Sequence, residues 1–397
     1  MCGRTKYKSF IKQIVKKILI VTKEYGNFKT GSGKYSHDLI VELSKFKDIK
    51  LSVICPLIEK SNDRLDGVNY FEFKKPNKSF GHASWLVYSS YLKREFTKAI
   101  KTEKYDIVHF TEARDALLIK KSDDLIFVGT VHDYLFAEAN IDYKKYQNLY
   151  PFDWLVRIFY YNFGKLLERN TLKKFNKLIS PSNYLNTILK NKYNLDKTKV
   201  DTINNGIALL NEKKLVKKKN QIFFVGNNYQ HKGLFDLIKA ADIVLKEYPV
   251  NFVIAGSDKK MQKKAELICR KNMIFKYFIF LGYQPNSVVK KYLSESKVFV
   301  YPSLVDNFPY TILESQTVGA TTISTRTGGI PEIISNNVNG LLVKPHDYVN
   351  LAKNIIKLLC DSGLSEKLST NSLKIIKKFS TKKMALKTRN CYSSLIS

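Results

Sequence analysis

Short apolar runs recur along the chain with amphipathic segments between them, and this alternation limits the possible folds more than any other feature. Five such runs lie in the first half, at 16–22, 50–56, 105–110, 125–133 and 177–182. Continuous apolar runs are typical of parallel strands that are buried on both faces. Segments 36–46 and 85–101 have the apolar spacing of crossover helices. The first half is therefore predicted to be a doubly wound α/β layer.

The same pattern starts again after the charged stretch 211–220. Six further runs lie at 221–226, 250–256, 278–283, 297–303, 321–325 and 340–345, and a helix-like segment follows each. A length of 397 residues also suits two domains. We predict Rossmann-like domains at 1–205 and 206–378, joined by a linker near 205–220. Ligands of such sheets bind beyond the carboxyl ends of the strands, so a central cleft between the domains is the expected site.

Cysteine content and hydropathy indicate the compartment. The five cysteines are far apart and form no C-x-x-C pair, which predicts reduced thiols in a cytoplasmic protein rather than a disulfide framework or a zinc site. Lysines split the apolar part of segment 1–21, which has no small-residue cleavage site, so a signal peptide is not predicted. No apolar run reaches the length of a membrane span. Any membrane contact is expected to be peripheral, on the inner face of the cytoplasmic membrane.

The chain is strongly basic, with a formal net charge of +32. Such a charge attracts phosphates on nucleic acid, on anionic lipid or on a phosphorylated substrate. A biased genome composition explains the lysine excess equally well, so the charge does not choose among these partners. Because no RNA-binding motif of the usual kinds is present, no nucleic-acid partner is predicted.

Segment 301–345, which begins YPSLVDNFPYTILES, contains the most informative motif. It follows a strand-like run, and Pro309 suits the first position of a helix, so turn 306–308 is expected to present free backbone N–H groups. Such a helix start binds anions, a diphosphate among them. Glu314 lies about one and a half turns further, and its side chain leans back toward the helix start, where it can accept hydrogen bonds from sugar hydroxyls.

The string PS-x-x-[ED]-x-F-x-x-x-x-L-E, followed by G-G-I-P-E-I-I and N-G-x-L-V-x-P, resembles the donor-site signature of the retaining glycosyltransferases of family 4, which have the two-domain GT-B fold. Asp306 and Glu314 keep the spacing of the family's E-x7-E motif, with Asp in place of the first Glu. The resemblance implies that Glu314 binds the nucleotide ribose and that Asp306 and the turn hold the donor sugar. The shorter Asp is expected to alter which sugar fits. The further substrate-binding residues implied here are Asn307, Phe308, Tyr310 and Thr311.

A second motif, FFVGNNYQHKG at 223–233, resembles the family's V-G-R-x-x-x-x-K-G loop. Lys232 matches the lysine that neutralises the donor diphosphate. Asn227 stands where many members have Arg, and His231 supplies a basic residue beside the lysine, so both are predicted to line the donor site. The alternative is that Lys232 is an ordinary surface charge.

In the first half, Gly31, Ser32 and Gly33 lie between the first predicted strand and helix, where small residues let the backbone approach a phosphate or sugar. Their position matches the family's glycine loop, although a simple turn has the same pattern. His132, at the end of a predicted strand, matches the histidine that faces the donor sugar, although a lone histidine is more often structural. Segment 379–397 resembles the family's last helix, which crosses back to the N-terminal domain.

The predicted fold class is therefore α/β, a GT-B arrangement of two doubly wound Rossmann-like domains facing a central cleft. The predicted activity is retaining transfer of a sugar from a UDP- or GDP-sugar to a glycan or lipid-linked acceptor in surface polysaccharide or lipopolysaccharide synthesis. His132, Lys232, Asp306 and Glu314 are the predicted catalytic residues. Neither a cofactor nor a metal is implied, because no D-x-D motif is placed to bind one.

Two alternatives stay open. One is a catalytically weakened basic protein of the same fold that serves as a membrane or nucleic-acid scaffold. The other is a different GT-B enzyme, an epimerase or a phosphorylase, although no pyridoxal-binding motif is seen.

Segment 153–175 mixes aromatic and basic residues. It is either a helix at an anionic membrane surface or a helix whose aromatic face is core.

Overall fold

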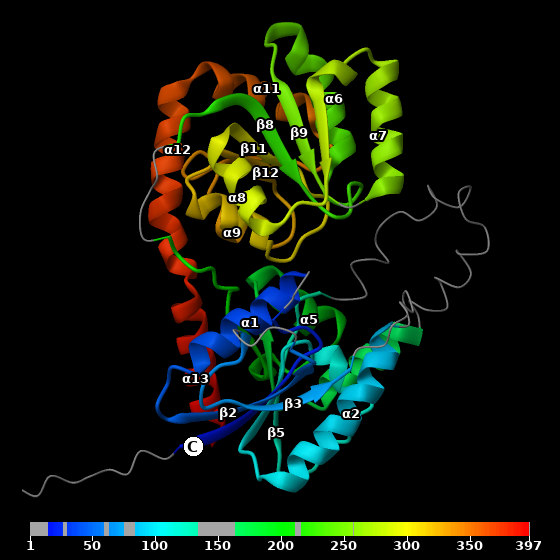
Figure 1. Cartoon of the computed structure of the whole chain (residues 1–397), viewed down its shortest axis with the longest axis vertical. Helices are drawn as coiled ribbons and strands as arrows, with labels where there is room; N and C mark the ends of the chain where they lie inside the picture. The colour runs from blue at the N-terminus through cyan, green and yellow to red at the C-terminus, as the bar shows by residue number, and fades with distance from the viewer. Residues whose placement is uncertain are drawn as a thin grey trace, which may run out of the picture.

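The computed structural model describes residues 15–26, 30–58, 63–74, 84–133, 163–210, 216–256 and 258–396. Two α/β domains lie one above the other along the long axis of the molecule (Figure 1). A parallel sheet forms the centre of each domain, with strand orders β3-β2-β1-β4-β5-β6-β7 and β10-β9-β8-β11-β12-β13. In both sheets the chain starts near the middle, winds to one edge and then to the other. The predicted pair of doubly wound domains with the GT-B fold is confirmed.

The strands of the N-terminal domain are β1 (Lys16–Val21), β2 (Ile49–Pro56), β3 (Asn69–Phe73), β4 (Ile107–Phe110), β5 (Ile126–Thr130), β6 (Lys177–Ser180) and β7 (Val200–Thr202). Those of the C-terminal domain are β8 (Lys219–Val225), β9 (Asn251–Ala255), β10 (Phe278–Gly282), β11 (Ser296–Tyr301), β12 (Thr322–Thr325) and β13 (Leu341–Val343). Every predicted apolar run overlaps one of these strands. The two strands that the pattern did not predict, β3 and β7, are the edges of the first sheet.

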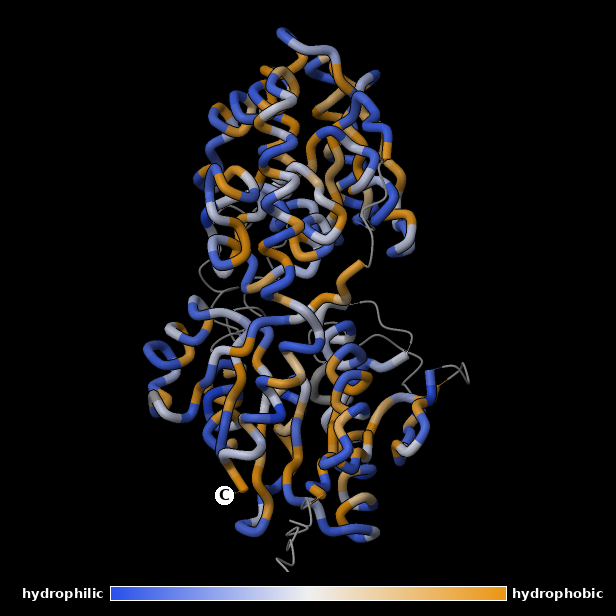
Figure 2. Tube along the Cα trace, turned by 90° about the vertical axis from the view of Figure 1, so that its left-hand side faces the viewer, coloured by the Kyte–Doolittle hydropathy of each residue, from blue (hydrophilic) through white to orange (hydrophobic). Residues whose placement is uncertain are grey.

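Helices cover both faces of each sheet. The α-helices of the N-terminal domain include α1 (Gly31–Leu43), α2 (Ser84–Thr102) and α5 (Asn183–Lys192), and residues 163–173 are also helical. The C-terminal half contributes α6 (Leu234–Glu247), α7 (Lys259–Lys271), α8 (Asn286–Glu295), α9 (Tyr310–Thr317), α10 (Ile330–Ile333), α11 (Tyr348–Cys360), α12 (Ser362–Ile375) and α13 (Thr381–Ile396). Short 3-10 turns include η3 (Ala113–Ala116), η5 (Lys197–Lys199), η6 (Phe275–Tyr277) and η7 (Ile376–Phe379). Figure 2 shows apolar residues inside both domains and hydrophilic residues on the outer turns of the helices.

The last helix returns to the N-terminal domain and lies beside α1 (Figure 1). Met384 and Tyr392 of α13 pack in one apolar cluster with Leu39 and Ile40 of α1. The two chain segments that cross between the domains are hydrogen-bonded to each other, because the N–H of Ile207 donates to the carbonyl of Phe379 at 2.8 Å.

A buried polar chain joins α13 to the first sheet. The hydroxyl of Tyr392 lies 2.5 Å from His109 Nδ1, and His109 Nε2 lies 2.8 Å from Thr130 Oγ1. Tyr35 Oη of α1 lies 2.9 Å from the same Thr130 oxygen. Burial lowers the pKa of His109 to about 3, so its imidazole is neutral and both ring nitrogens serve as hydrogen-bonding groups.

The predicted interfacial segment 153–175 is described only from residue 163 onward. Within that part Phe163 and Leu166 are about half exposed, whereas Leu172 and Phe175 are buried in the core. Among the described residues, no helix is both long enough and apolar enough to cross a membrane.

Candidate active site

A cleft of about 610 Å³ lies where the two domains meet. Its walls are the loops that follow β8, β9, β10 and β11 on one side, and the start of α1 with the residues after β5 on the other. These are carboxyl ends of parallel strands, which is where doubly wound sheets bind ligands. Every predicted site residue except Gly33 lines the cleft. Gly33 is buried in the first turn of α1, where its N–H donates to Thr30 Oγ1.

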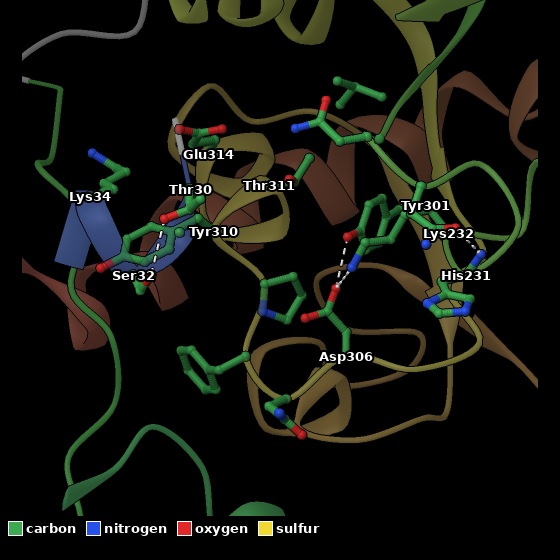
Figure 3. Close-up of a pocket in the computed structure, with 18 of the residues that line it drawn as sticks. Thr30, Ser32, Lys34, His231, Lys232, Tyr301, Asp306, Tyr310, Thr311 and Glu314 are labelled. Atoms are coloured by element: carbon green, nitrogen blue, oxygen red, sulfur yellow. Dashed lines mark hydrogen bonds and ion pairs between the residues drawn. The ribbon is translucent and has the colours of Figure 1, made fainter. Parts of the chain in front are cut away.

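A partly buried ion pair lies on the C-terminal wall (Figure 3). Lys232 Nζ donates to Asp306 Oδ2 at 2.6 Å, and the hydroxyl of Tyr301 donates to the same oxygen at 2.8 Å. Burial is the largest single influence on the pKa of Lys232 and lowers it, but the attraction and hydrogen bonds of Asp306 and Tyr301 together outweigh burial and raise that pKa above its ordinary value. The ammonium group is therefore charged at neutral pH and can form an ion pair with an anionic ligand. Tyr301 was not among the predicted residues.

Beside this ion pair, the loop that contains Lys232 and Gly233 packs against the turn that contains Pro302 and Ser303. Gly233 precedes α6 with a φ of +78°, in the left-handed region that favours glycine. A Cβ at this position would lie 1.9 Å from the carbonyl oxygen of Pro302. The carbonyl of His231 accepts hydrogen bonds from the Leu304 N–H at 2.8 Å and from Ser303 Oγ at 3.2 Å. These contacts fix Lys232 against the turn that carries Asp306.

His231 and Asn227 complete the loop after β8. Burial and the neighbouring Lys232 lower the pKa of His231, so its imidazole adds a hydrogen-bonding group to the cleft rather than a second charge at neutral pH. Asn227 is exposed at the edge of the cleft. Many family members have an Arg at this position, so the cleft of this chain lacks the positive charge that such an Arg carries.

The turn at 306–308 is hydrogen-bonded to the N-terminal half of the chain. Asn307 Nδ2 donates to the carbonyl of His132 at 2.9 Å, and Asn205 Nδ2 donates to the carbonyl of Phe308 at 3.3 Å. Pro309 is extended and is the N-cap of α9, so the first helical position belongs to Tyr310, one residue later than predicted. No side chain caps the helix, and its first amides face the cleft wall that Tyr310 and Thr311 line.

Glu314 lies at the opposite end of the same wall from the ion pair (Figure 3). Its side chain is 6% exposed, and Asn286 Nδ2 of α8 donates to Glu314 Oε1 at 2.7 Å. Burial raises the pKa of Glu314, although Asn286 and the charge of Lys34 oppose that rise. Asn286 was missed by sequence reasoning, as were Tyr283 and Gln284, which also line the cleft. No spacing rule connects these three residues to the predicted motifs.

The N-terminal domain closes the cleft through the start of α1. Gly31 lies so near Tyr310 that a Cβ there would contact the ring at 3.4 Å. Lys34 Nζ lies 5.6 Å from the centre of the Tyr310 ring, within the range of a cation–π contact. Ser32, predicted from the glycine loop, lines the cleft beside them.

His132 faces the cleft from the end of β5. Its ring packs edge-on against Tyr35 with centroids 4.5 Å apart. Nε2 is buried without a hydrogen-bond partner, and burial lowers the pKa of the imidazole. A neutral histidine with an unused nitrogen suits hydrogen bonding to a sugar hydroxyl rather than charge stabilisation. Within the described parts of the chain, no three His, Cys, Asp or Glu side chains are grouped as metal ligands would be.

Comparison with known proteins matches almost the whole chain. The model of Glycosyltransferase Family 4 matches residues 29–209, and that of Glycosyl transferases group 1 matches residues 208–375. An uncharacterised glycosyltransferase of Methanocaldococcus jannaschii is 23% identical over 352 residues, covering 83% of this chain and 85% of the relative. The UDP-Gal:alpha-D-GlcNAc-diphosphoundecaprenol alpha-1,3-galactosyltransferase of Escherichia coli is 25% identical over 324 residues, covering 75% of this chain and 78% of the relative.

The crystal structure of Anabaena HepE in complex with UDP-glucose shares the fold, with a TM-score of 0.71 at 16% identity over 95% of this chain and 99% of that one. The fold, the order of the motifs and the two adjoining family matches agree. The chain therefore belongs to glycosyltransferase family 4 and is a glycosyltransferase with the GT-B fold.

Proposed function

We propose that this enzyme is a retaining glycosyltransferase that takes a sugar from a UDP- or GDP-sugar and adds it to a glycan or lipid-linked acceptor in surface polysaccharide or lipopolysaccharide synthesis. One observation carries the proposal: a charged lysine, an uncapped helix start and a buried carboxylate lie along a single wall of the cleft (Figure 3). Lys232 and the start of α9 suit a diphosphate. Glu314 suits the hydroxyls of a ribose.

The chemistry follows from the charges that develop when the bond between the anomeric carbon and the diphosphate breaks. Negative charge builds on the diphosphate, where Lys232 and the first amides of α9 stabilise it. Positive charge builds on the sugar, near the carboxylate of Asp306. Both hydrogen bonds to Asp306 use Oδ2, so Oδ1 is available to the donor sugar. The departing phosphate takes the proton of the acceptor hydroxyl, so neither a covalent nucleophile nor a metal ion is required.

The proposed substrates draw support from the relatives. The Escherichia coli relative is named for a UDP-galactose donor and a lipid-diphosphate-linked acceptor, and HepE was crystallised with UDP-glucose. UDP-sugars are therefore the first donors to test. The convergence of Asp306, Glu314 and Lys232 in one cleft does not favour a catalytically weakened scaffold protein.

The test is a donor panel. Purified enzyme is incubated with UDP- and GDP-sugars, with and without acceptor extracts, and the released nucleoside diphosphate is measured. We expect release from one nucleotide class, unchanged by a chelator, and an α-linked product from an α-linked donor. Absence of both release and donor binding across the panel would refute the proposed function. Loss of activity on chelation, restored by Mg²⁺ or Mn²⁺, would refute metal independence.

A further inference from the structure

A carboxylate of the C-terminal domain is bound by backbone amides of the N-terminal domain beside the donor cleft. The N–H of Asn183 donates to Glu332 Oε2 at 2.9 Å, and the N–H of Tyr184 donates to Glu332 Oε1 at 2.9 Å. Glu332 lies in the short helix α10, whereas the two amides open α5 in the other domain. This two-oxygen contact is a direct polar link between the domains.

The contact supplies hydrogen-bond acceptors for the first amides of α5. The first amides of an α-helix have no partner within the helix. In α5 the Leu185 N–H donates to Ser182 Oγ at 3.1 Å, which satisfies the third amide. The first two amides are those that Glu332 binds. A carboxylate at this end of the ten-residue helix is also favoured by the helix dipole.

The segment that leads to Glu332 also supports the donor-site turn. The N–H of Gly329 donates to the carbonyl of Asp306 at 3.1 Å. A Cβ on Gly329 would lie 1.9 Å from the carbonyl oxygen of Asn307 and 2.8 Å from Ser182 Cβ, so this backbone fills the space between the turn and α5. A shift of α5 relative to Glu332 would therefore also shift the turn that carries Asp306.

We propose that Glu332 is a positioning residue for glycosyl transfer: its docking on α5 holds the domains in the arrangement in which the Asp306–Asn307 turn faces His132. The inference rests on the proposed donor site. Glu332 is outside the set of residues that line the cleft, so it acts through the turn rather than on the donor.

Hydrogen exchange of the backbone amides tests the contact between Glu332 and α5 in the absence of substrate. Exchange is followed by mass spectrometry with fragmentation to single residues in the wild type, Glu332→Gln, Glu332→Ala and a control, Glu366→Gln, which makes the same charge change at an exposed position of α12. We expect the amides of Asn183 and Tyr184 to exchange about tenfold faster in Glu332→Ala than in the wild type and the control. Glu332→Gln keeps one acceptor oxygen and should be intermediate. Equal exchange in all four proteins would overturn the contact.

Kinetics then separate positioning from folding. With the donor found in the panel, Glu332→Ala should lower kcat about tenfold, while the Kd for UDP changes less than twofold, because the nucleotide-binding residues proposed above lie in the C-terminal domain. Faster exchange combined with an unchanged kcat would overturn the positioning role, and so would a loss of UDP binding equal to the loss of kcat. A wild type that turns over no donor would refute the proposed function, whereas the exchange result would still decide whether Glu332 joins the domains.

Discussion

The ion pair between Lys232 and Asp306 allows a test that separates its structural role from its catalytic one. Lys232→Met removes the ammonium but keeps most of the unbranched side chain. Asp306, whose side chain is 14% exposed, then keeps the Tyr301 hydroxyl on Oδ2 but loses its counter-ion. Because this pair is partly buried, removing one partner is expected to cost about 3 kcal/mol, the lower end of the range for buried pairs. At roughly 2–4 °C for each kcal/mol in a domain of this size, the Tm should fall by about 6–12 °C.

Turnover should fall further than the loss of stability explains. The loss of one group that stabilises charge in the transition state lowers kcat by roughly 10²–10³. The double variant Lys232→Met/Asp306→Asn removes both charges, so no unpaired carboxylate is left in the wall. We expect it to recover most of the Tm and none of the turnover.

The assay is released nucleoside diphosphate at saturating donor, beside thermal melts of the two variants and of Lys246→Met. That control changes a lysine of α6 whose side chain is 73% exposed. A double variant that regains turnover together with Tm would show that Lys232 only balances the charge of Asp306. Wild-type turnover in the single variant would remove Lys232 from the mechanism altogether.

Three further results are expected. Glu314→Gln should cut turnover a hundredfold or more. Burial raises the pKa of Glu314, so as pH falls the donor KM of the wild type should rise at a higher pH than for an ordinary Glu, whose pKa is about 4.3; a KM that stays flat until the pH falls to about 4.3 would contradict this. His109 binds a proton more weakly when folded (pKa about 3) than when unfolded (about 6.5), so folding stability should drop as pH falls through that window, and melts of His109→Gln should show a smaller drop. The protein should sediment with anionic vesicles at low salt but not with neutral ones, and equal binding to both would assign the aromatic residues of 153–175 to the core.

The parts of the fold that the sequence predicted are those in which burial acts on a continuous segment. Inner strands such as β1 and β11 are covered on both faces, so the last four residues of each are apolar and buried, and they stand out as runs. Strand β3 is an edge strand with the half-buried sequence NYFEF, and β7 has only three residues. Neither strand forms a run that a pattern search detects.

The residues of the candidate site also divide into those that the sequence predicted and those that it did not. Lys232, Asp306 and Glu314 lie in contiguous motifs, so their place in the cleft was predicted. Contacts that depend on how separate elements pack were not, and these include the Asn286 amide on Glu314 and the Tyr301 hydroxyl on Asp306. Gly33 belongs to the glycine loop in sequence but is turned into the helix by the cap at Thr30.

The return of α13 to the N-terminal domain has a consequence for biosynthesis. The N-terminal sheet is translated first, yet one of its faces is covered by Met384, Cys391 and Tyr392, which are translated after the whole second domain. Until then His109 lacks the Tyr392 hydroxyl, and the apolar face beneath α13 stays uncovered while the whole second domain is made. The nascent N-terminal domain therefore cannot reach its final packing before α13 is translated, and a stop codon placed immediately before α13 would leave an apolar face of the first domain uncovered beside a second domain whose sheet is complete.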